Sequence, residues 1–480
     1  MTKKLEMDFT KGKIFSKFLL FVLPIIGVNL LQAFYTSADM MIVGLSKNTN
    51  AVGSIGTTGQ FIGLFTNLYI GFSVGVNVVV ARNIGAKNEE KVSRSVHSAI
   101  VIAIVCGLFC CVSAVIAARP VLTLMGVEGA VLDLAVRYIY FYMIGTPFTA
   151  LYLYLVAISR AKGDSRTPLI IGLFSGLLNV VLNLFFVLGL NLDVEGVALA
   201  TAISNVVSSL ILFIKQMRVS DLTKIYIKKI KLYKDSVKEI IFVGIPSAIQ
   251  NIIGSLSIVI IQTGVLTVNS MHLYPDTDYQ PVMAGVGVAL NLIRFTENAL
   301  SAVYVGAMAV ASQNMGAKNY KRIYSVIGAG VITVLLFGLP LGIGMVLFHE
   351  PLFALYGLGK GVSIALKDLA FNSALTVLIV EGALFFICGF MDLGTGILRA
   401  LGKSTTAMAI TLIGAVLFRI LWILFIFPLH PTLVMAYICY PITWVLTTIT
   451  SATICLVTLS KKIKNQKSEN ESKNILDEVA

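Results

Sequence analysis

The side chains of this 480-residue chain that could do chemistry are a few ionisable groups placed inside long apolar runs. They are four acids and two bases: Asp39, Glu297, Glu381, Asp392, Arg294 and Arg419. An ionisable group at the centre of a bilayer costs about 2.5–3.5 kcal/mol on insertion scales, so each is a candidate for function. The excess of acids over bases favours a cavity that receives cations.

Other reactive groups form no recognisable site. The histidines, His97, His272, His349 and His430, are scattered over loops and helix ends, and the six cysteines lack metal-ligand spacing. The stretch GILRALGKST does not complete a phosphate-binding loop, because Ile397 stands where a glycine is needed five positions before Gly402. We therefore expect a protein that is not an enzyme and has no cofactor.

Composition indicates which elements must position the ionisable groups. Hydrophobic residues make up 57% of the chain and charged residues 13%, whereas soluble domains carry about 25% charged residues. Too little polar material remains to cover a soluble surface. This excludes a soluble enzyme, a secreted disulfide scaffold and a disordered chain. Long apolar runs, rather than short alternating segments, predict membrane-spanning helices.

The predicted fold class is an all-α integral membrane protein with twelve transmembrane helices. Each span needs about 20 apolar residues to cross the hydrocarbon core. The runs of sufficient length lie near residues 18–44, 52–81, 95–118, 134–158, 168–190, 195–214, 239–267, 282–312, 324–348, 368–398, 405–428 and 432–459.

The basic residues orient these spans. Of the 37 lysines and arginines, 30 fall on the side of the two termini, 5 on the opposite side, and Arg294 and Arg419 within spans. This bias predicts that both termini are cytoplasmic in a multi-pass protein, which we expect in the bacterial inner membrane. The net charge of +13 is then a topology signal and does not indicate a nucleic-acid partner.

The two halves of the chain resemble each other. Three segments recur in the same order: FVLP (21–24) as VGIP (243–246), ARNIGAKNEEKV (81–92) as ASQNMGAKNYKRI (311–323), and SRAKGDSRTP (159–168) as LRALGKSTTA (398–407). Two six-helix halves that start on the same membrane face are parallel repeats, a layout of alternating-access transporters. The predicted domains are a cytoplasmic segment (1–17), an N-lobe (18–214), a basic linker (215–238), a C-lobe (239–459) and a polar cytoplasmic tail (460–480).

The linker at 215–238 carries eight lysines and arginines. Such a segment could be an interfacial helix held by anionic lipid. It could also be an ordinary basic loop on the cytoplasmic side.

With these spans and repeats, the chain resembles the multidrug and toxic compound extrusion (MATE) family. The matching segments are FVLPIIGVNLLQAFYTSADMMIVGL (21–45), GFSVGVNVVVARNIGAKN (71–88), SRAKGDSRTP (159–168), NVVLN (179–183), GVALATAIS (196–204) and DLGTGILRALGKS (392–404). The resemblance implies two pseudo-symmetric six-helix lobes. It also implies export of mostly cationic, amphipathic compounds in exchange for H⁺ or Na⁺.

The resemblance also implies an ion-coupling site in the N-lobe. Asp39 matches the aspartate of the first span, and Asn179, Asn183 and Thr201 match its partners in spans five and six. The family's usual pattern in span five is asparagine followed four residues later by aspartate, whereas this chain has Asn183. Asn183 can offer a carbonyl oxygen to Na⁺ but cannot titrate, which leaves Asp39 as the only proton carrier expected at this site.

Two roles are possible for each of two acids in the C-lobe, Glu297 and Asp392. Arg294 and Glu297 are three residues apart, so they can neutralise each other on one helix face, or substrate can compete with Arg294 for Glu297. Asp392 can share in ion coupling, as an aspartate near this position does in one branch of the family, or can pair with Arg419. The candidate residues for the substrate cavity are Gln32, Tyr35, Gln250, Glu297 and Asp392.

These features predict a secondary active multidrug exporter. It would exchange small amphipathic, cationic compounds for H⁺ or Na⁺. We expect membrane lipid as a partner and a monomeric protein. The alternative is a lipid-linked saccharide flippase of a related superfamily branch, which would be expected to hold several arginines for pyrophosphate. Only Arg294 and Arg419 lie within spans. A receptor or scaffold would not need a duplicated interior that carries acids.

Overall fold

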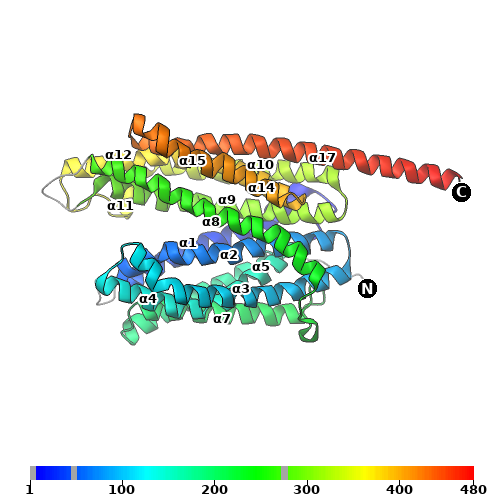
Figure 1. Ribbon diagram of the computed structural model, residues 1–480, viewed down its shortest axis with the longest axis horizontal. Coiled ribbons are helices and arrows are strands. Elements are labelled where there is room, and N and C mark those ends of the chain that lie inside the picture. Colours follow the sequence, from blue (N-terminus) through cyan, green and yellow to red (C-terminus); the bar gives the residue numbers. More distant parts are fainter. Residues whose placement is uncertain (1–6, 45–50, 272–278, 480) are drawn as a thin grey trace. The chain divides into compact units, whose positions relative to one another are not determined.

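The computed structural model describes residues 7–44, 51–271 and 279–479. Lys3, Lys4 and Lys47 of the orientation count and His272 lie outside these ranges. Within the described ranges the chain is helical and has no strand. The helices of the first half are α1 (Ile14–Gly44), α2 (Ala51–Gly85), α3 (Glu89–Leu124), α4 (Gly129–Ile144), α5 (Thr146–Ala161), α6 (Arg166–Leu184) and α7 (Val194–Arg218) (Figure 1).

The second half contains longer and more interrupted helices. They are α8 (Lys234–Ser270), α9 (Pro281–Gly316), α10 (Tyr320–Leu347), α11 (His349–Leu355), α12 (Ile364–Val377), α13 (Phe385–Ala400), α14 (Ser404–Thr411), α15 (Phe418–Leu421), α16 (Leu433–Tyr437) and α17 (Cys439–Val479). Single π-helical turns join several of these pieces: η3 (Leu378–Gly382), η4 (Leu412–Leu417) and η5 (Trp422–Ile426), with η1 (Phe185–Gly189) after α6.

Each predicted span corresponds to a helix or to a run of joined helices. Within the described ranges, ten runs are long and apolar enough to cross a membrane, and α4 with α5 form an eleventh that bends by 49°. The bend follows from Pro147 near the start of α5, because proline cannot donate the backbone hydrogen bond that would continue α4. The twelfth predicted span is α9, which has 36 residues and carries Arg294 and Glu297.

The contacts divide the chain into two compact units. Unit 1 comprises Met1–Phe9 and Leu20–Ile252, and unit 2 comprises Thr10–Leu19 and Ile253–Ala480. The division therefore falls inside α1 and inside α8 rather than in the 215–238 linker. Each of these two helices begins in one unit and ends in the other.

The recurring sequence segments fold into equivalent turns. Lys87, after α2, and Lys318, after α9, both adopt left-handed backbone conformations, with φ of 55° and 56°. The next residue donates a backbone hydrogen bond five positions back in each case, from Asn88 to Asn83 O (3.1 Å) and from Asn319 to Asn314 O (2.8 Å). Few non-glycine residues adopt this conformation, so its occurrence at both positions supports the internal repeat.

The second pair of recurring segments behaves in the same way. Gly163 and Gly402 have φ of 89° and 85°, and each donates to the carbonyl three residues earlier at 3.0 Å. A residue with a side chain would be strained at either position. The two halves therefore share their tight turns as well as their order of helices.

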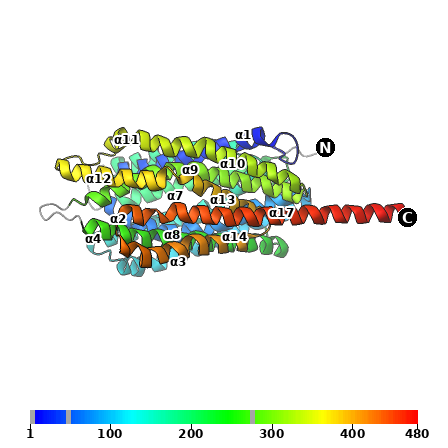
Figure 2. The ribbon, with the colours of Figure 1, turned by 90° about the horizontal axis from the view of Figure 1, so that it is seen from above.

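The longest helix is α17, and only its first part can lie within the membrane. Figures 1 and 2 show its C-terminal part extending past the ends of the other helices of unit 2. This part carries lysines and glutamates beyond Leu459. The tail that was predicted as a polar segment at 460–480 is therefore a helical continuation of the last span.

Candidate functional site

The four residues predicted for ion coupling form one hydrogen-bonded chain in unit 1. Asn183 donates from Nδ2 to Oδ1 of Asp39 at 2.5 Å and to Oδ1 of Asn179 at 3.2 Å. Asn179 in turn donates from Nδ2 to Oγ1 of Thr201 at 3.3 Å. The hydroxyl of Thr201 donates to the carbonyl of Val197 at 3.0 Å, which ends the chain on the backbone of α7.

Helix geometry brings these groups together. Asn179 and Asn183 are one helical turn apart, so both lie on the same face of α6. That face packs against α7, which carries Thr201, and both asparagines are buried. Asp39 comes from α1 and is half-buried. Three helices, α1, α6 and α7, thus each supply part of the cluster.

The cluster has one acidic group and one unsatisfied oxygen. Oδ1 of Asn183 is buried and has no hydrogen-bond partner. A buried acceptor without a partner is costly, and a few such groups in native structures mark places where a proton, ion or water is bound. The cluster therefore offers carboxylate, amide and hydroxyl oxygens, the ligands that hard cations prefer. No group of three or more His, Cys, Asp or Glu side chains that could hold a metal ion occurs within the described ranges.

Tyr35 lies beside this cluster and packs closely on α6. Its hydroxyl donates to the carbonyl of Leu173 at 3.3 Å, and its ring lies over Gly176. A Cβ at Gly176 would collide with that ring, so the glycine is needed for α1 and α6 to approach. Of the other cavity candidates in unit 1, Gln32 on α1 is exposed and Gln250 on α8 is half-buried.

Two tyrosines near Asp39 escaped the sequence reasoning. Tyr138 and Tyr142 on α4 stack with ring centroids 5.8 Å apart, and the charge of Asp39 acts on both hydroxyls. Tyr138 is buried, and Tyr142 is half-buried. Their spacing of four residues, which puts both on one face of α4, was the available signal. They place two aromatic hydroxyls near the carboxylate of Asp39.

In the structure Arg419 is held by groups other than a carboxylate. Arg419 is buried, donates from Nε to Oγ1 of Thr443 at 3.1 Å and stacks over the ring of Tyr440 at 4.1 Å. A planar guanidinium can be satisfied by an aromatic face and a hydroxyl without a carboxylate. Neither Asp392 nor Glu297 forms an ion pair with it within the described ranges.

Arg294 and Glu297 share α9 as predicted, but no ion pair joins them in this part of the chain. Both side chains are exposed on unit 2, where long side chains need not meet. The charge of Arg294 still acts on Glu297. Asp392 on α13 is half-buried, and the charges of Arg399 and Glu297 act on it.

Glu381 is the C-lobe acid that the sequence reasoning undervalued. It lies in the π-helical turn η3, is buried, and its Oε2 has no hydrogen-bond partner. Arg419 is the basic group that acts on it electrostatically. π-Helical turns occur frequently at functional sites, and this one places a carboxylate inside unit 2.

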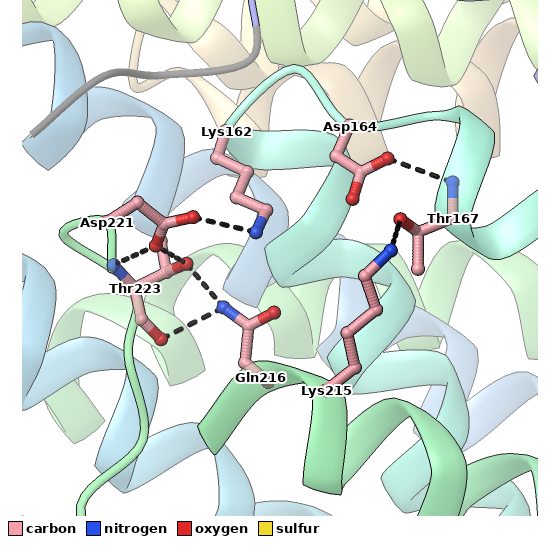
Figure 3. A network of polar contacts seen from close by, with 7 residues as sticks. All are labelled: Lys162, Asp164, Thr167, Lys215, Gln216, Asp221 and Thr223. Carbon is pink, nitrogen blue, oxygen red and sulfur yellow. Dashed lines mark hydrogen bonds and ion pairs between the residues drawn. The ribbon is translucent and has the colours of Figure 1, made fainter. Parts of the chain in front are cut away.

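The basic linker includes the end of α7 and the start of α8, and between them residues 219–233 form a loop with one 3₁₀ turn that is tied to unit 1. Figure 3 shows Lys162, in the recurring 159–168 turn, paired with Asp221 at 2.8 Å. Both side chains are nearly buried, at 3% and 11% exposure. Thr223 donates its backbone N–H (2.8 Å) and its hydroxyl (2.6 Å) to the same carboxylate. Burial alone would raise the pKa of Asp221, but Lys162 and Thr223 outweigh it and hold that pKa below its ordinary value.

Neighbouring contacts extend this network. Gln216, at the end of α7, donates to the carbonyl of Thr223 at 3.0 Å. Lys215 donates to the hydroxyl of Thr167, and Asp164 accepts the backbone N–H of Thr167 at 2.9 Å. The recurring turn is thereby fixed to the end of α7 and to the linker (Figure 3).

Comparison with known proteins agrees with this architecture. The MatE family model matches residues 24–185 and 246–425, one segment in each half. Multidrug export protein MepA of Staphylococcus aureus (strain N315) is 28% identical over 421 residues, which cover 87% of this chain and 88% of that protein. MepA of Staphylococcus saprophyticus is 24% identical over 417 residues, again 87% and 88% of the two chains.

Solved structures show the same fold. A MATE crystal structure in complex with MaD3S has a TM-score of 0.85 at 17% identity, and the match covers 95% of this chain and 98% of that one. An outward-facing multidrug resistance MATE family transporter of the MOP superfamily has a TM-score of 0.84 at 17% identity, with the same coverage. With the family model matching most of the sequence, the chain belongs to the MATE family of efflux transporters.

Proposed function

We propose that this protein is a secondary active multidrug exporter that exchanges small amphipathic cations for H⁺ or Na⁺ by alternating access. The observation that carries the proposal is the hydrogen-bonded cluster of Asp39, Asn183, Asn179 and Thr201, buried among helices of a transporter family. The MepA relatives are multidrug export proteins, which supports multidrug export by this chain. Both termini would be cytoplasmic, in a bacterial inner membrane, and a single chain would do the work.

Proton uptake at Asp39 would act through the amide of Asn183. With Asp39 ionised, Asn183 presents its NH₂ group to the carboxylate. A protonated carboxyl becomes a donor, and the unsatisfied Oδ1 of Asn183 is then the better partner. Rotation of the Asn183 amide would exchange the positions of its NH₂ group and its Oδ1. The hydrogen bond from the NH₂ group to Asn179 would then be disturbed. Ion uptake would thereby be passed from α1 to α6.

Sodium uptake would use the same atoms differently. The oxygens of Asp39, Asn179, Asn183 and Thr201 could surround a Na⁺ ion, with Asp39 supplying the charge. In either case the net negative charge of the cluster is cancelled. A cationic substrate would then lose an attractive partner, and neutralised Asp39 would favour release outside.

The conformational change would use the helix that carries Asp39. Pro24 interrupts the hydrogen-bond ladder of α1, and Gly27 lies three residues further on. Since Pro24 precedes Asp39 on α1, a bend near Pro24 would move the part of the helix that carries the ion-coupling acid. Substrate and ion need only bias the two states differently for exchange to occur.

The flippase alternative has weaker support. Pyrophosphate recognition favours several arginines whose guanidinium groups are available for bidentate hydrogen bonds. Of the two arginines within spans, Arg419 is already engaged with Thr443 and Tyr440. The other arginine within a span, Arg294, is exposed. One exposed arginine is fewer than pyrophosphate recognition would be expected to need.

Transport by the purified wild-type protein tests the proposal. Proteoliposomes loaded with a fluorescent cationic dye would be given an inward H⁺ gradient, an inward Na⁺ gradient, or neither. We expect one of the two gradients to accelerate dye export, and an uncoupler or a sodium ionophore to abolish the effect. Equal dye movement with and without both gradients would contradict an ion-coupled exporter.

A further inference from the structure

Unit 2 holds a basic pocket at the turn between α9 and α10. Its volume is about 490 Å³. The lining comes from three separate parts of the chain: Thr10 before α1, the turn residues Lys318, Asn319, Tyr320, Lys321 and Arg322, and Ile463, Gln466, Lys467 and Asn470 on α17. We call this the α9–α10 pocket. The four lining residues on α17 follow at spacings of three, one and three, so they occupy one helix face.

Hydrogen bonds fix the three walls of the α9–α10 pocket to one another. Arg322 donates to the carbonyl of Gly12 at 2.5 Å, and Asn319 donates to that of Thr10 at 3.4 Å. On the other side, Gln466 donates to the carbonyl of Lys318 at 3.1 Å. The pocket is therefore a built feature of the fold rather than a gap between unrelated loops.

Four of the lining residues are basic and none is acidic. Lys318, Lys321 and Lys467 are exposed at the pocket, and Arg322 is half-buried beside them. No acidic side chain lines the pocket beside Lys318, Lys321 and Lys467. An anion bound among them would relieve their mutual repulsion and would accept several charge-assisted hydrogen bonds.

The internal repeat supplies a natural comparison. The equivalent turn of the first half, between α2 and α3, borders a pocket of about 450 Å³. There Glu89 and Glu90 stand at the positions that correspond to Tyr320 and Lys321. Both glutamates line the first pocket, and Glu90 forms an ion pair with Arg94. The first pocket thus contains its own counter-charges, whereas the α9–α10 pocket lacks them.

The position of the α9–α10 pocket identifies the source of an anion. It lies at the ends of three membrane helices, on the side that the distribution of basic residues predicts to be cytoplasmic. The amine of Lys462 lies 5.8 Å from the centre of the Tyr320 ring, at the pocket rim. Tyrosine and lysine are characteristic of the membrane–water interface. Beside the cytoplasmic ends of spans the abundant anion is the phosphate of acidic lipids, and basic clusters next to a span attract it.

We propose that the α9–α10 pocket binds the phosphate of an anionic phospholipid headgroup. Lys318, Lys321 and Lys467 supply its counter-charges. The bound lipid joins the N-terminal segment, the α9–α10 turn and the extension of α17.

Lipid binding to the purified full-length protein tests this proposal. Native mass spectrometry would compare retention of dioleoyl phosphatidylglycerol with that of dioleoyl phosphatidylcholine. We expect the wild type to retain phosphatidylglycerol selectively. The triple variant Lys318→Gln, Lys321→Gln, Lys467→Gln should bind it about a hundredfold more weakly, since three basic residues near the surface are removed. The matched control Lys87→Gln, Lys91→Gln, Lys228→Gln removes the same charge from unit 1 and should bind like the wild type.

A second variant separates lost binding from misfolding. Tyr320→Glu with Lys321→Glu transfers the acidic pair of the first half into the second, at the start of α10. Acids are favourable in the first turn of a helix, so the fold should be kept while phosphatidylglycerol is rejected. Equal losses in the two lysine triples, or unchanged retention in the acidic variant, would overturn the proposal. Displacement of phosphatidylglycerol by low millimolar inorganic phosphate would contradict a lipid headgroup as the source of the phosphate bound in the α9–α10 pocket.

Discussion

Asn183 on α6 donates a hydrogen bond to Asp39 on α1 across 144 positions of sequence, with an N···O distance of 2.5 Å. The contact joins the acid of the N-lobe to a residue that cannot titrate. The amide of Asn183 is therefore in direct contact with the carboxylate of Asp39, and a change in the charge of Asp39 acts on it first. The proposed ion coupling depends on this relationship.

Removing the amide should therefore impair coupling without removing the acid. Asn183→Ala deletes the donor to Asp39 and the unsatisfied oxygen together. A hydrogen bond to a charged group contributes about 1.5–3 kcal/mol, so we expect gradient-driven dye export to fall roughly tenfold to a hundredfold. Leu184→Ala, an exposed neighbour on the same helix, is the control and should transport normally. Wild-type rates in Asn183→Ala would argue against the relay through α6.

The close approach of α1 and α6 makes a steric prediction. Gly176→Ala places a Cβ in the ring of Tyr35, and overpacking of this kind costs about 1–3 kcal/mol. We expect a lower melting temperature in detergent. At Gly172, on the same helix, the nearest atoms to a new Cβ are 3.7 Å away, so Gly172→Ala should melt like the wild type. Because the collision needs both groups, adding Tyr35→Ala to Gly176→Ala should recover part of the loss.

The linker network makes a prediction about stability and pH. Lys162→Met leaves the carboxylate of Asp221 buried without its cation, which costs about 3–5 kcal/mol. The pKa of Asp221 is lowered in the folded protein, so its stabilisation is present above the unfolded pKa of about 3.9 and is lost as pH falls through the folded value. The difference in melting temperature between the wild type and Lys162→Met should thus be constant from pH 6 to 8 and shrink only in strong acid. The exposed Lys228→Met should show no such difference.

The buried polar groups of unit 2 make a prediction about compensation. Arg419→Gln removes the cation that acts on the buried Glu381 and the stacking on Tyr440. We expect destabilisation of about 1–3 kcal/mol, the usual cost of a buried group left without its partner. Glu381→Gln in the same chain should restore part of it, because the uncompensated charge is then gone. Purely additive melting temperatures would show that the two residues act independently.

The sequence was informative where a signal is local or repeated. Apolar runs predicted the helices, and the recurring segments fold into matching turns at Lys87 with Lys318 and at Gly163 with Gly402. The Asp39 cluster was reached through residues that match a family pattern, since nothing local links Asp39 to Asn183. Spacing of four on one helix explains why Asn179 and Asn183 come together.

The sequence was least informative where a side chain has several possible partners and helix packing decides which one it contacts. Arg419 has a carboxylate within electrostatic reach but bonds to Thr443 and stacks on Tyr440. Such choices depend on which helices pack together, and helical spacing cannot supply that information. Glu381 was undervalued for a related reason, because a π-helical turn changes the face on which a residue lies.

Transport by an Asp39→Asn variant tests the central claim most directly. Dye export from proteoliposomes would be measured under separate H⁺ and Na⁺ gradients for the wild type, for Asp39→Asn and for Asp368→Asn, which removes an exposed acid. The account predicts that Asp39→Asn loses the acceleration by either gradient, while Asp368→Asn keeps that of the wild type. Gradient-driven export by Asp39→Asn at the wild-type rate would contradict it.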